Sequence, residues 1–207
     1  MKKSTSEKYD RVSDNYDRME ELIEKLFFRK YRHLAVSLAR GKVLEVGIGT
    51  GKNLPHYNSE INLVGIDFST GMLSKANDRK EKLGMHNVEL KKMDIENLAF
   101  DSNTFDTVIS TFVFCTVPNP TKGLSELHRV LKPDGKAIFL EHMLSKNPLI
   151  NLFLYFMNIF STSFLGTSMV RKTQENIEKT GFSLIHVRYL FLDVIRLIIA
   201  RKTDKSS

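Results

Sequence analysis

The stretch VLEVGIGTGKNLPHY, residues 43–57, sets three glycines at alternate positions directly after a short apolar run. An apolar run of this length with β-branched residues is typical of a buried strand. Because glycine has no side chain, the chain can turn sharply after the strand and its backbone can approach a bound molecule closely. The stretch therefore predicts a strand that leads into a ligand-binding loop.

The spacing of these glycines separates the loop from two common nucleotide-binding motifs. The dinucleotide fingerprint G-x-G-x-x-G would need its third glycine at position 52, where the chain has Lys52. A phosphate-binding P-loop would need G-x-x-x-x-G-K-[ST], and this pattern does not occur in the sequence. The spacing argues against NAD or FAD and excludes a P-loop.

The rest of the chain alternates apolar runs of strand length with helical patterns. The first five runs are apolar enough to be buried on both faces, and each of the first four precedes a segment that could form a crossover helix. Only FLD separates the last two, so we expect them to pair as an antiparallel edge hairpin. The pattern predicts an α/β fold with a doubly wound, seven-stranded, mostly parallel sheet. The predicted strands are 42–46, 61–67, 88–93, 105–111, 136–142, 182–190 and 194–201.

Size and composition favour a single domain over residues 1–207. This length suffices for one core and is short for two ordinary domains. The one cysteine, Cys115, excludes a disulfide framework and a cysteine-rich zinc site, as in a reducing cytosol. No apolar region of the kind a secretory signal needs follows MKKSTSEKYD. We therefore expect a cytoplasmic protein.

Asp67 ends the second predicted strand, 20 residues after Gly47. In a doubly wound sheet, ligands bind outside the carboxyl ends of the strands, where such a carboxylate can accept hydrogen bonds from both hydroxyls of an unphosphorylated ribose. The alternative is a cap on the following helix, which Ser69 could also provide. Because the acid and the glycine loop occur together, we favour the ribose.

Five stretches between Val43 and Glu141 resemble the class I S-adenosylmethionine-dependent methyltransferases, whose fold is Rossmann-like. They are VLEVGIGTG, GIDFSTGML, KKMDIENL, FDTVISTFVFCTVPNP and RVLKPDGKAIFLEH. Each stretch is a weak signal alone, and the combination is specific. The resemblance implies that the cofactor is S-adenosyl-L-methionine.

The resemblance also implies which residues hold this cofactor. In such enzymes the E-x-G-x-G-x-G loop binds the methionine half, an acid after the second strand binds the ribose, and an acid after the third strand binds the adenine amino group. The last of these is Asp94 here, with Ile95 beside the ring. The cofactor-binding residues that we expect are Glu45, Gly47, Gly49, Gly51, Asp67, Phe68, Met72, Asp94, Ile95 and Ser110.

Methyl transfer from a sulfonium needs few reactive side chains, because the leaving group is a neutral thioether and alignment lowers most of the barrier. The six histidines show no ligand spacing, so we expect no metal. An amine or thiol acceptor calls for a weak base. Our catalytic candidates are His142, at the end of the fifth strand, and Tyr16, in the N-terminal segment. The alternatives are a structural histidine and a core aromatic.

Two segments outside the cofactor-binding core at 41–142 bear on the acceptor. Within residues 1–40, apolar side chains at helical spacing surround a basic cluster of Arg29, Lys30 and Arg32. This pattern favours either a helix packed on the sheet or a lid whose basic end lies on an anionic membrane surface.

The second segment, 148–170, contains an apolar run from Leu149 to Phe160. This run is shorter than the ~20 residues that span a bilayer. The run favours a buried helix or an apolar cover, and we lean towards a cover over a lipophilic acceptor.

Short motifs bear on the class of acceptor. The chain has STFVFCTV where nucleic-acid amino methyltransferases carry [NDS]-P-P-[YF], and we treat the net charge of +7 as a solvated face, so nucleic acid is not expected. FCTVPNP, LEH and the pattern at 171–182 resemble bacterial phospholipid N-methyltransferases and membrane-associated alkyl thiol methyltransferases. Y-D-x-x-S-x-x-Y-D at 9–17 and RVLKPDG resemble quinone C-methyltransferases.

We therefore expect a lipophilic or lipid-headgroup acceptor, N-methylated as in phosphatidylethanolamine, at the inner membrane face. S-methylation of an alkyl thiol and C-methylation of a quinone precursor are alternatives. A non-catalytic, cofactor-binding regulator is the alternative from another class.

Overall fold

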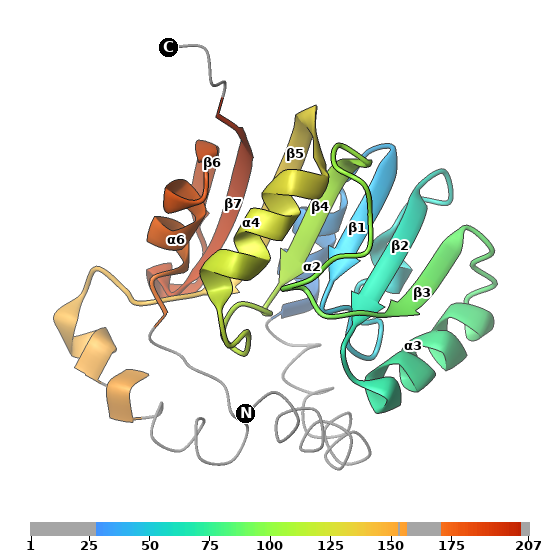
Figure 1. Cartoon of the computed structure of the whole chain (residues 1–207). Coiled ribbons are helices and arrows are strands. Elements are labelled where there is room, and N and C mark those ends of the chain that lie inside the picture. Colours follow the sequence, from blue (N-terminus) through green and yellow to red (C-terminus); the bar gives the residue numbers. More distant parts are fainter. Residues whose placement is uncertain (1–27, 153, 157–170, 204–207) are drawn as a thin grey trace.

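A seven-stranded sheet forms the centre of the computed structural model, which describes residues 28–152, 154–156 and 171–203 (Figure 1). The strand order is β3-β2-β1-β4-β5-β7-β6, and β7 runs antiparallel to both of its neighbours while β1 to β5 are parallel. The strands are β1 (Lys42–Val46), β2 (Asn62–Asp67), β3 (Val88–Lys92), β4 (Phe105–Thr111), β5 (Leu131–His142), β6 (Phe182–Tyr189) and β7 (Ile195–Lys202). The predicted doubly wound sheet and its antiparallel edge hairpin are confirmed. The fifth strand begins earlier than expected, at Leu131.

Side chains alternate between two cores along each inner strand, as the period of two in a strand requires. In β1, Leu44 and Val46 join the core under α4, whereas Val43 joins the core under α2. In β5, Phe139 faces the α4 side and Leu140 the α2 side. This alternation fixes on which side of the sheet the polar residues at the strand ends lie.

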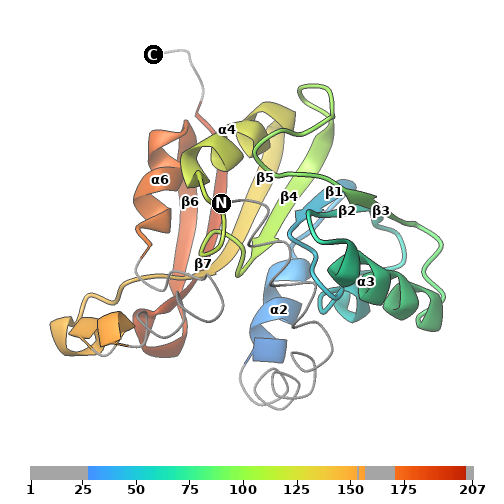
Figure 2. The same cartoon turned by 60° about the horizontal axis from the view of Figure 1, so that its bottom comes forward.

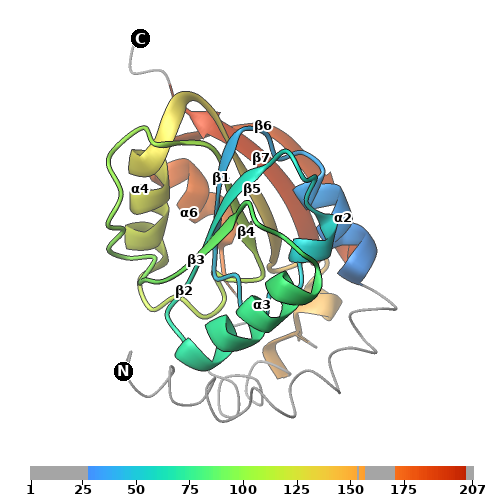
Figure 3. The ribbon, with the colours of Figure 1, turned by 90° about the vertical axis from the view of Figure 1, so that its right-hand side faces the viewer.

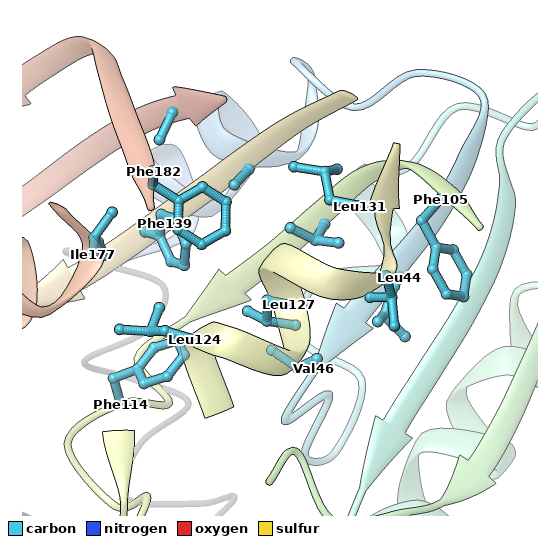
Figure 4. Packing of buried hydrophobic residues seen from close by; sticks show 14 of the residues in the cluster. Leu44, Val46, Phe105, Phe114, Leu124, Leu127, Leu131, Phe139, Ile177 and Phe182 are labelled. Atoms are coloured by element: carbon cyan, nitrogen blue, oxygen red, sulfur yellow. The ribbon is translucent and has the colours of Figure 1, made fainter. Parts of the chain in front are cut away.

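Helices cover both faces of the sheet. The helices in the described part of the chain include α2 (Arg29–Val36), α3 (Thr70–Lys82), α4 (Pro120–Val130) and α6 (Thr173–Lys179), with short 3-10 helices η2 (Leu54–His56) and η3 (Phe191–Asp193). In Figure 3, α4 lies on one side of the strands and α2 on the other. Leu124 and Leu127 of α4 belong to the buried cluster between this helix and the strands, with Leu127 drawn near Val46 (Figure 4).

The helix starts follow from local capping. Ser69 caps α3, because its Oγ accepts a hydrogen bond from the backbone N–H of Met72 at 3.2 Å. Asn119 caps α4 in the same way through Lys122, and Pro120 stands in the first turn, where its missing N–H costs nothing.

Two expectations about the strands were wrong. Among the first four strands, only β2 and β4 precede an α-helix: β1 precedes η2, and residues 93–104 after β3 form turns. β3 is not buried on both faces, since of its residues only Val88 is buried. The reason is its place at the edge of the sheet, where one face and one side meet solvent.

The sheet order changes direction between β1 and β4, which are neighbours although β2 and β3 separate them in the chain. Loops that follow the two strands at such a switch point diverge and leave room for a ligand. The carboxyl ends of the parallel strands lie at the bottom of Figure 1, and this edge comes forward in Figure 2.

Candidate active site

The glycine loop after β1 touches the loop after β4 at the switch point. Gly47 has φ +59°, and a Cβ built on it would lie 2.6 Å from Cγ2 of Val113. Both the left-handed backbone and this crowding require glycine at position 47.

Open space lies above Gly49. This residue has φ +56°, and a Cβ on it would meet only the carbonyl oxygen of Gly47, at 4.0 Å. The neighbouring Thr50 is buried, and its Oγ1 has no hydrogen-bond partner among the described residues. An open backbone beside an orphaned hydroxyl fits a ligand with polar groups that lies on this loop.

Asp67 connects the glycine loop to the end of β2. Its Oδ2 accepts a hydrogen bond from the Gly49 N–H at 2.9 Å, and its Oδ1 accepts one from the Ser69 N–H at 2.9 Å. The side chain is buried, with 7% of its surface exposed. Ser69 takes the capping role on α3 that was the alternative for Asp67. A carboxylate at this position is an acceptor to which ribose hydroxyls could donate hydrogen bonds.

Glu45, near the carboxyl end of β1, belongs to a buried network of polar side chains. Its Oε1 accepts a hydrogen bond from Nδ2 of Asn53 at 2.9 Å, and its Oε2 accepts one from the Tyr57 hydroxyl at 2.8 Å. Burial raises the pKa of the Glu45 carboxyl to about 7, although these hydrogen bonds and Arg32 act to lower it. Burial and the carboxylate together raise the pKa of Tyr57 well above its ordinary value.

Sequence reasoning missed Asn53 and Tyr57. Both stand in the opening stretch, within a dozen residues of Glu45, and they are polar residues just after an apolar strand that contains this acid. An acid in an apolar strand predicts hydrogen-bond donors close by, because a buried carboxylate requires them, and Asn53 and Tyr57 could have been found in this way.

Arg32 of α2 lies in the site and not on a basic surface, which was one of the two interpretations of this segment. Its Nη1 donates to Oγ1 of Thr111 at 2.9 Å and to Oδ1 of Asn53 at 3.3 Å. Arg29 and Lys30 are exposed, as the membrane-facing interpretation requires. Arg32 differs because it precedes the buried Ala35 and Val36 by three and four positions, which places it on the buried side of the helix.

Glu141 lies near the carboxyl end of β5, on the α4 side of the sheet. It is fully buried, and its Oε1 accepts hydrogen bonds from Oγ of Ser110 at 2.6 Å and from the Val113 N–H at 3.1 Å. Its Oε2 has no partner among the described residues, and burial raises the pKa of this carboxyl to about 7. Ser110 is fully buried too, so its hydroxyl supports Glu141. The signal in the sequence was a charged residue at the end of the apolar run AIFLEH.

His142 points to the opposite side of the sheet from Glu141, toward α2. Its ring stacks on Phe112 with the ring centroids 6.2 Å apart, and Phe28 contacts the same Phe112 ring edge-on at 5.2 Å. Burial lowers the pKa of His142, and its Nδ1 has no partner among the described residues. The Arg32 guanidinium lies 5.1 Å from the Phe112 centroid, so one aromatic ring joins His142 to the network around Glu45.

The remaining expected cofactor residues lie along the same edge. Asp94 follows β3, and its Oδ1 accepts a hydrogen bond from the Glu96 N–H at 3.0 Å. Ile95 packs against the core on the α4 side. Phe68 is half-buried, and Met72 is buried in the first turn of α3. Their roles toward a cofactor stay predictions.

Two further expectations concern Tyr16 and the apolar segment. Tyr16 lies outside the described residues. Residues 148–152 and 154–156 are helical, and Leu149 and Leu152 are 75% and 69% exposed. Over these residues the segment is therefore not a buried helix, although Leu154 is buried.

The described residues contain neither a candidate membrane-spanning helix nor a candidate metal site. No helix there combines the length and the apolar character that a membrane crossing requires. Within the same ranges, no three His, Cys, Asp or Glu side chains are grouped so that they could hold a metal ion.

Known proteins share this chain's sequence pattern and fold. Residues 44–139 match a family model described as a methyltransferase domain. A phosphatidylethanolamine N-methyltransferase of Cereibacter sphaeroides is 41% identical over 116 residues, which cover 55% of this chain and 57% of that protein. A demethylmenaquinone methyltransferase of Staphylococcus epidermidis is 31% identical over 172 residues, which cover 75% and 69%.

A solved structure of a Thermotoga maritima protein, described as an S-adenosylmethionine-dependent methyltransferase and possible histamine N-methyltransferase, has the same fold. It superposes with a TM-score of 0.73 over 95% of this chain and 99% of that one, at 20% identity. The chain spans about three fifths of the length of the first curated relatives that it matches, from 57% to 61%. Together with the glycine loop and the strand-end acids, these matches show that the chain belongs to the class I S-adenosylmethionine-dependent methyltransferases.

Proposed function

We propose that this protein transfers a methyl group from S-adenosyl-L-methionine to a lipophilic or lipid-headgroup acceptor, and specifically that it N-methylates a phosphatidylethanolamine-type lipid. The observation that carries the cofactor half of the proposal is the open backbone above Gly49, whose N–H is bonded to the Asp67 carboxylate.

The residues at this edge fit the cofactor. Glu45 would hold the ammonium of the methionine half, Asp67 the ribose hydroxyls, and Asp94 the adenine amino group, while the orphaned Thr50 hydroxyl offers one more polar contact. When bound, S-adenosylmethionine supplies a methyl group on a sulfonium, which leaves as a neutral thioether.

The cluster of Phe112, Phe28 and His142 would receive the acceptor. Aromatic faces attract an ammonium group, as a lipid amine carries before it is methylated. Because burial lowers the pKa of His142, the imidazole is neutral near pH 7 and could accept the proton that the amine must lose. Tyr16 remains a second candidate for this role. The 41% identity to a phosphatidylethanolamine N-methyltransferase supports the choice of acceptor.

Two other acceptors follow from the same arrangement. The likeness to a demethylmenaquinone methyltransferase supports C-methylation of a quinone precursor, and an alkyl thiol would also need only a weak base. A regulator that binds the cofactor without turnover is the candidate from another class. For any lipid acceptor we place the protein at the cytoplasmic face of the inner membrane.

Cofactor binding is tested by calorimetry on matched glycine variants. Gly49→Ala should bind S-adenosylmethionine at least tenfold more weakly than wild type, because the added methyl fills the open space above the loop. Gly84→Ala is the control, since Gly84 also has a left-handed backbone, φ +63°, with no atom within 4 Å of its Cβ position. Asp67→Ala should weaken binding by a similar factor. Wild-type affinity in Gly49→Ala and Asp67→Ala would refute the proposed cofactor site.

The acceptor is tested by the release of S-adenosylhomocysteine from protein incubated with phosphatidylethanolamine vesicles, with an alkyl thiol or with a reduced quinone precursor. We expect turnover with the vesicles. Turnover only with the thiol or only with the quinol would identify that compound as the acceptor in place of the lipid. Cofactor binding without any turnover would favour the regulator.

A further inference from the structure

Exposed apolar side chains concentrate at one corner of the molecule. Among the described residues, nine large hydrophobic side chains are at least 44% exposed. All but Leu83 and Ile185 lie either in the helical residues 148–152 and 154–156 or between the last residue of β6 and the start of β7. We call these seven residues the apolar rim: Leu149, Leu152, Tyr155, Phe156, Tyr189, Phe191 and Leu192. A concentration of this kind marks an interaction surface.

The two parts of the rim are held next to each other. The Lys146 N–H, just before the helical residues, donates to Oδ2 of Asp193 in the β6–β7 connection at 2.8 Å. Nη2 of Arg196 donates to the Leu144 carbonyl at 2.6 Å. In Figures 1 and 2 the helical segment stands away from the sheet at the corner where β6 and β7 meet. The rim is therefore a protruding surface made of two elements.

The rim borders the candidate active site. His142 pairs with Ile195, at the start of β7, and the Met143 N–H donates to the Val194 carbonyl at 2.9 Å. Tyr189 ends β6, and Phe191 and Leu192 follow it. They lie along the same edge of the sheet as His142, because β5 and β6 both run antiparallel to β7.

The backbone of the turn supports a role for its apolar tip. Leu192 has φ +47° and is 59% exposed. Glycine and asparagine adopt this conformation at little cost, whereas a leucine there is uncommon and strained. Strain of this kind is typical of functional positions, and here it holds an apolar side chain in solvent.

Basic residues stand beside the apolar ones. Nζ of Lys146 lies 4.6 Å from the Tyr189 ring centroid, and the Arg196 guanidinium carbon lies 5.2 Å from it. Arg188 is exposed on the neighbouring position of β6. Aliphatic and aromatic side chains flanked by tyrosine and cations are typical of surfaces that lie in the headgroup region of an anionic bilayer.

We propose that the apolar rim inserts into the headgroup region of an anionic lipid bilayer and holds the sheet edge with His142 against the membrane. The inference rests on the proposed function, because a lipid acceptor would then reach His142 without leaving the bilayer. A protruding helix and turn suit a deformable bilayer, and the cations beside Tyr189 match anionic headgroups.

Co-sedimentation with vesicles of phosphatidylcholine and phosphatidylglycerol in equal parts tests the rim. Two double variants each make one part of the rim polar. The first carries Leu149→Gln and Leu152→Gln on the helix, and the second carries Phe191→Ser and Leu192→Asn on the turn. Each should lower the partition coefficient about tenfold or more, because two apolar side chains leave the bilayer. The control is Leu83→Gln, whose side chain is exposed too, at 44%, but lies after α3. It should bind as wild type does.

Folding and cofactor binding are checked in the same samples. Asparagine tolerates the left-handed backbone at position 192, so the turn variant should stay folded. The inference is overturned if both rim variants bind vesicles as wild type does, or if Leu83→Gln loses binding equally. It is also overturned if wild type is a dimer and the rim variants are monomers, because the rim would then be a contact between copies. If wild type binds vesicles through the rim but methylates no phosphatidylethanolamine, the proposed acceptor fails and the rim inference stands.

Discussion

At the scale of single residues, two buried glutamates dominate the site from opposite sides of the sheet. Glu45 at the end of β1 faces α2, and Glu141 at the end of β5 faces α4, each with a carboxyl pKa raised to about 7 by burial. A buried carboxyl that titrates near neutrality is typical of a functional site, because stability alone would favour an apolar residue there.

The first prediction concerns the pH dependence of stability. The unfolded Glu45 carboxyl has a pKa near 4.5 and the folded one about 7, so between these values the folded state holds the proton more tightly. Wild type should therefore lose stability relative to Glu45→Gln as the pH rises through this window, by up to about 3 kcal/mol, and the difference should be constant above it. Urea unfolding of both proteins from pH 5 to 8 measures this.

Glu126→Gln is the control for that prediction. The Arg129 side chain lowers the pKa of Glu126, so its contribution is present above the unfolded value and is lost only as the pH falls toward the folded one. Its difference from wild type should not change between pH 5 and 8. A Glu45→Gln difference that is equally flat would show that the folded carboxyl is ionised throughout.

The second prediction concerns His142. His142→Gln should lower kcat with a lipid amine by about a hundredfold or more while the KM for the cofactor stays unchanged, because the variant cannot accept the proton. Since the pKa of His142 lies below its ordinary value of 6.5, the wild-type rate should not decline on this account until the pH falls below that value. Steady-state release of S-adenosylhomocysteine measures both. Unchanged kcat in the variant would assign His142 a packing role against Phe112.

At the scale of elements, the contact between the loops after β1 and β4 builds the site. Gly47 meets Val113, while the Val113 N–H donates to Glu141 of β5. Val113 therefore links the ends of β1, β4 and β5. α2 joins them through Arg32, which reaches Thr111 of β4 and Asn53 of the glycine loop.

The third prediction concerns this loop contact. Gly47→Ala should lower the free energy of unfolding by about 2 to 4 kcal/mol, which combines left-handed strain with the crowding of Val113. Gly84→Ala, with φ +63° and open space around it, should cost only about 1 kcal/mol, from strain alone. Adding Val113→Ala to Gly47→Ala should recover part of the loss. Chemical denaturation compares the four proteins, and equal costs at positions 47 and 84 would mean that the two loops do not touch.

At the scale of the whole molecule, the site draws on residues from both halves of the sheet and from α2, so ligand binding should stabilise the entire fold. The fourth prediction is that S-adenosylmethionine at one hundred times its Kd raises the free energy of unfolding by about 2.7 kcal/mol. For a chain of this size, that corresponds to a Tm higher by about 5 to 10 °C. Asp67→Ala at the same concentration should show a smaller shift, about 1.4 kcal/mol for a tenfold weaker Kd. Differential scanning calorimetry measures the Tm of both proteins, and an equal shift in both would exclude Asp67 from the site.

The sequence by itself determined the strands, the edge hairpin and the positions of Gly47, Gly49 and Asp67. These features are local: periodicity of two marks a strand, and a residue just after a parallel strand must lie at its carboxyl edge. Ser69 as the cap of α3 was also readable, because capping involves only the next three residues.

Only the tertiary structure decided which distant residues meet. Ser110 and Glu141 share a hydrogen bond because β4 and β5 are neighbours, Arg32 enters the site because α2 packs its face on the sheet, and β3 is exposed because it is the edge strand. The apolar rim likewise joins residues 148–152 and 154–156 to a turn near position 192. Such contacts depend on strand order and helix rotation, which arise from the packing of the whole chain and leave no periodic signal in any single segment.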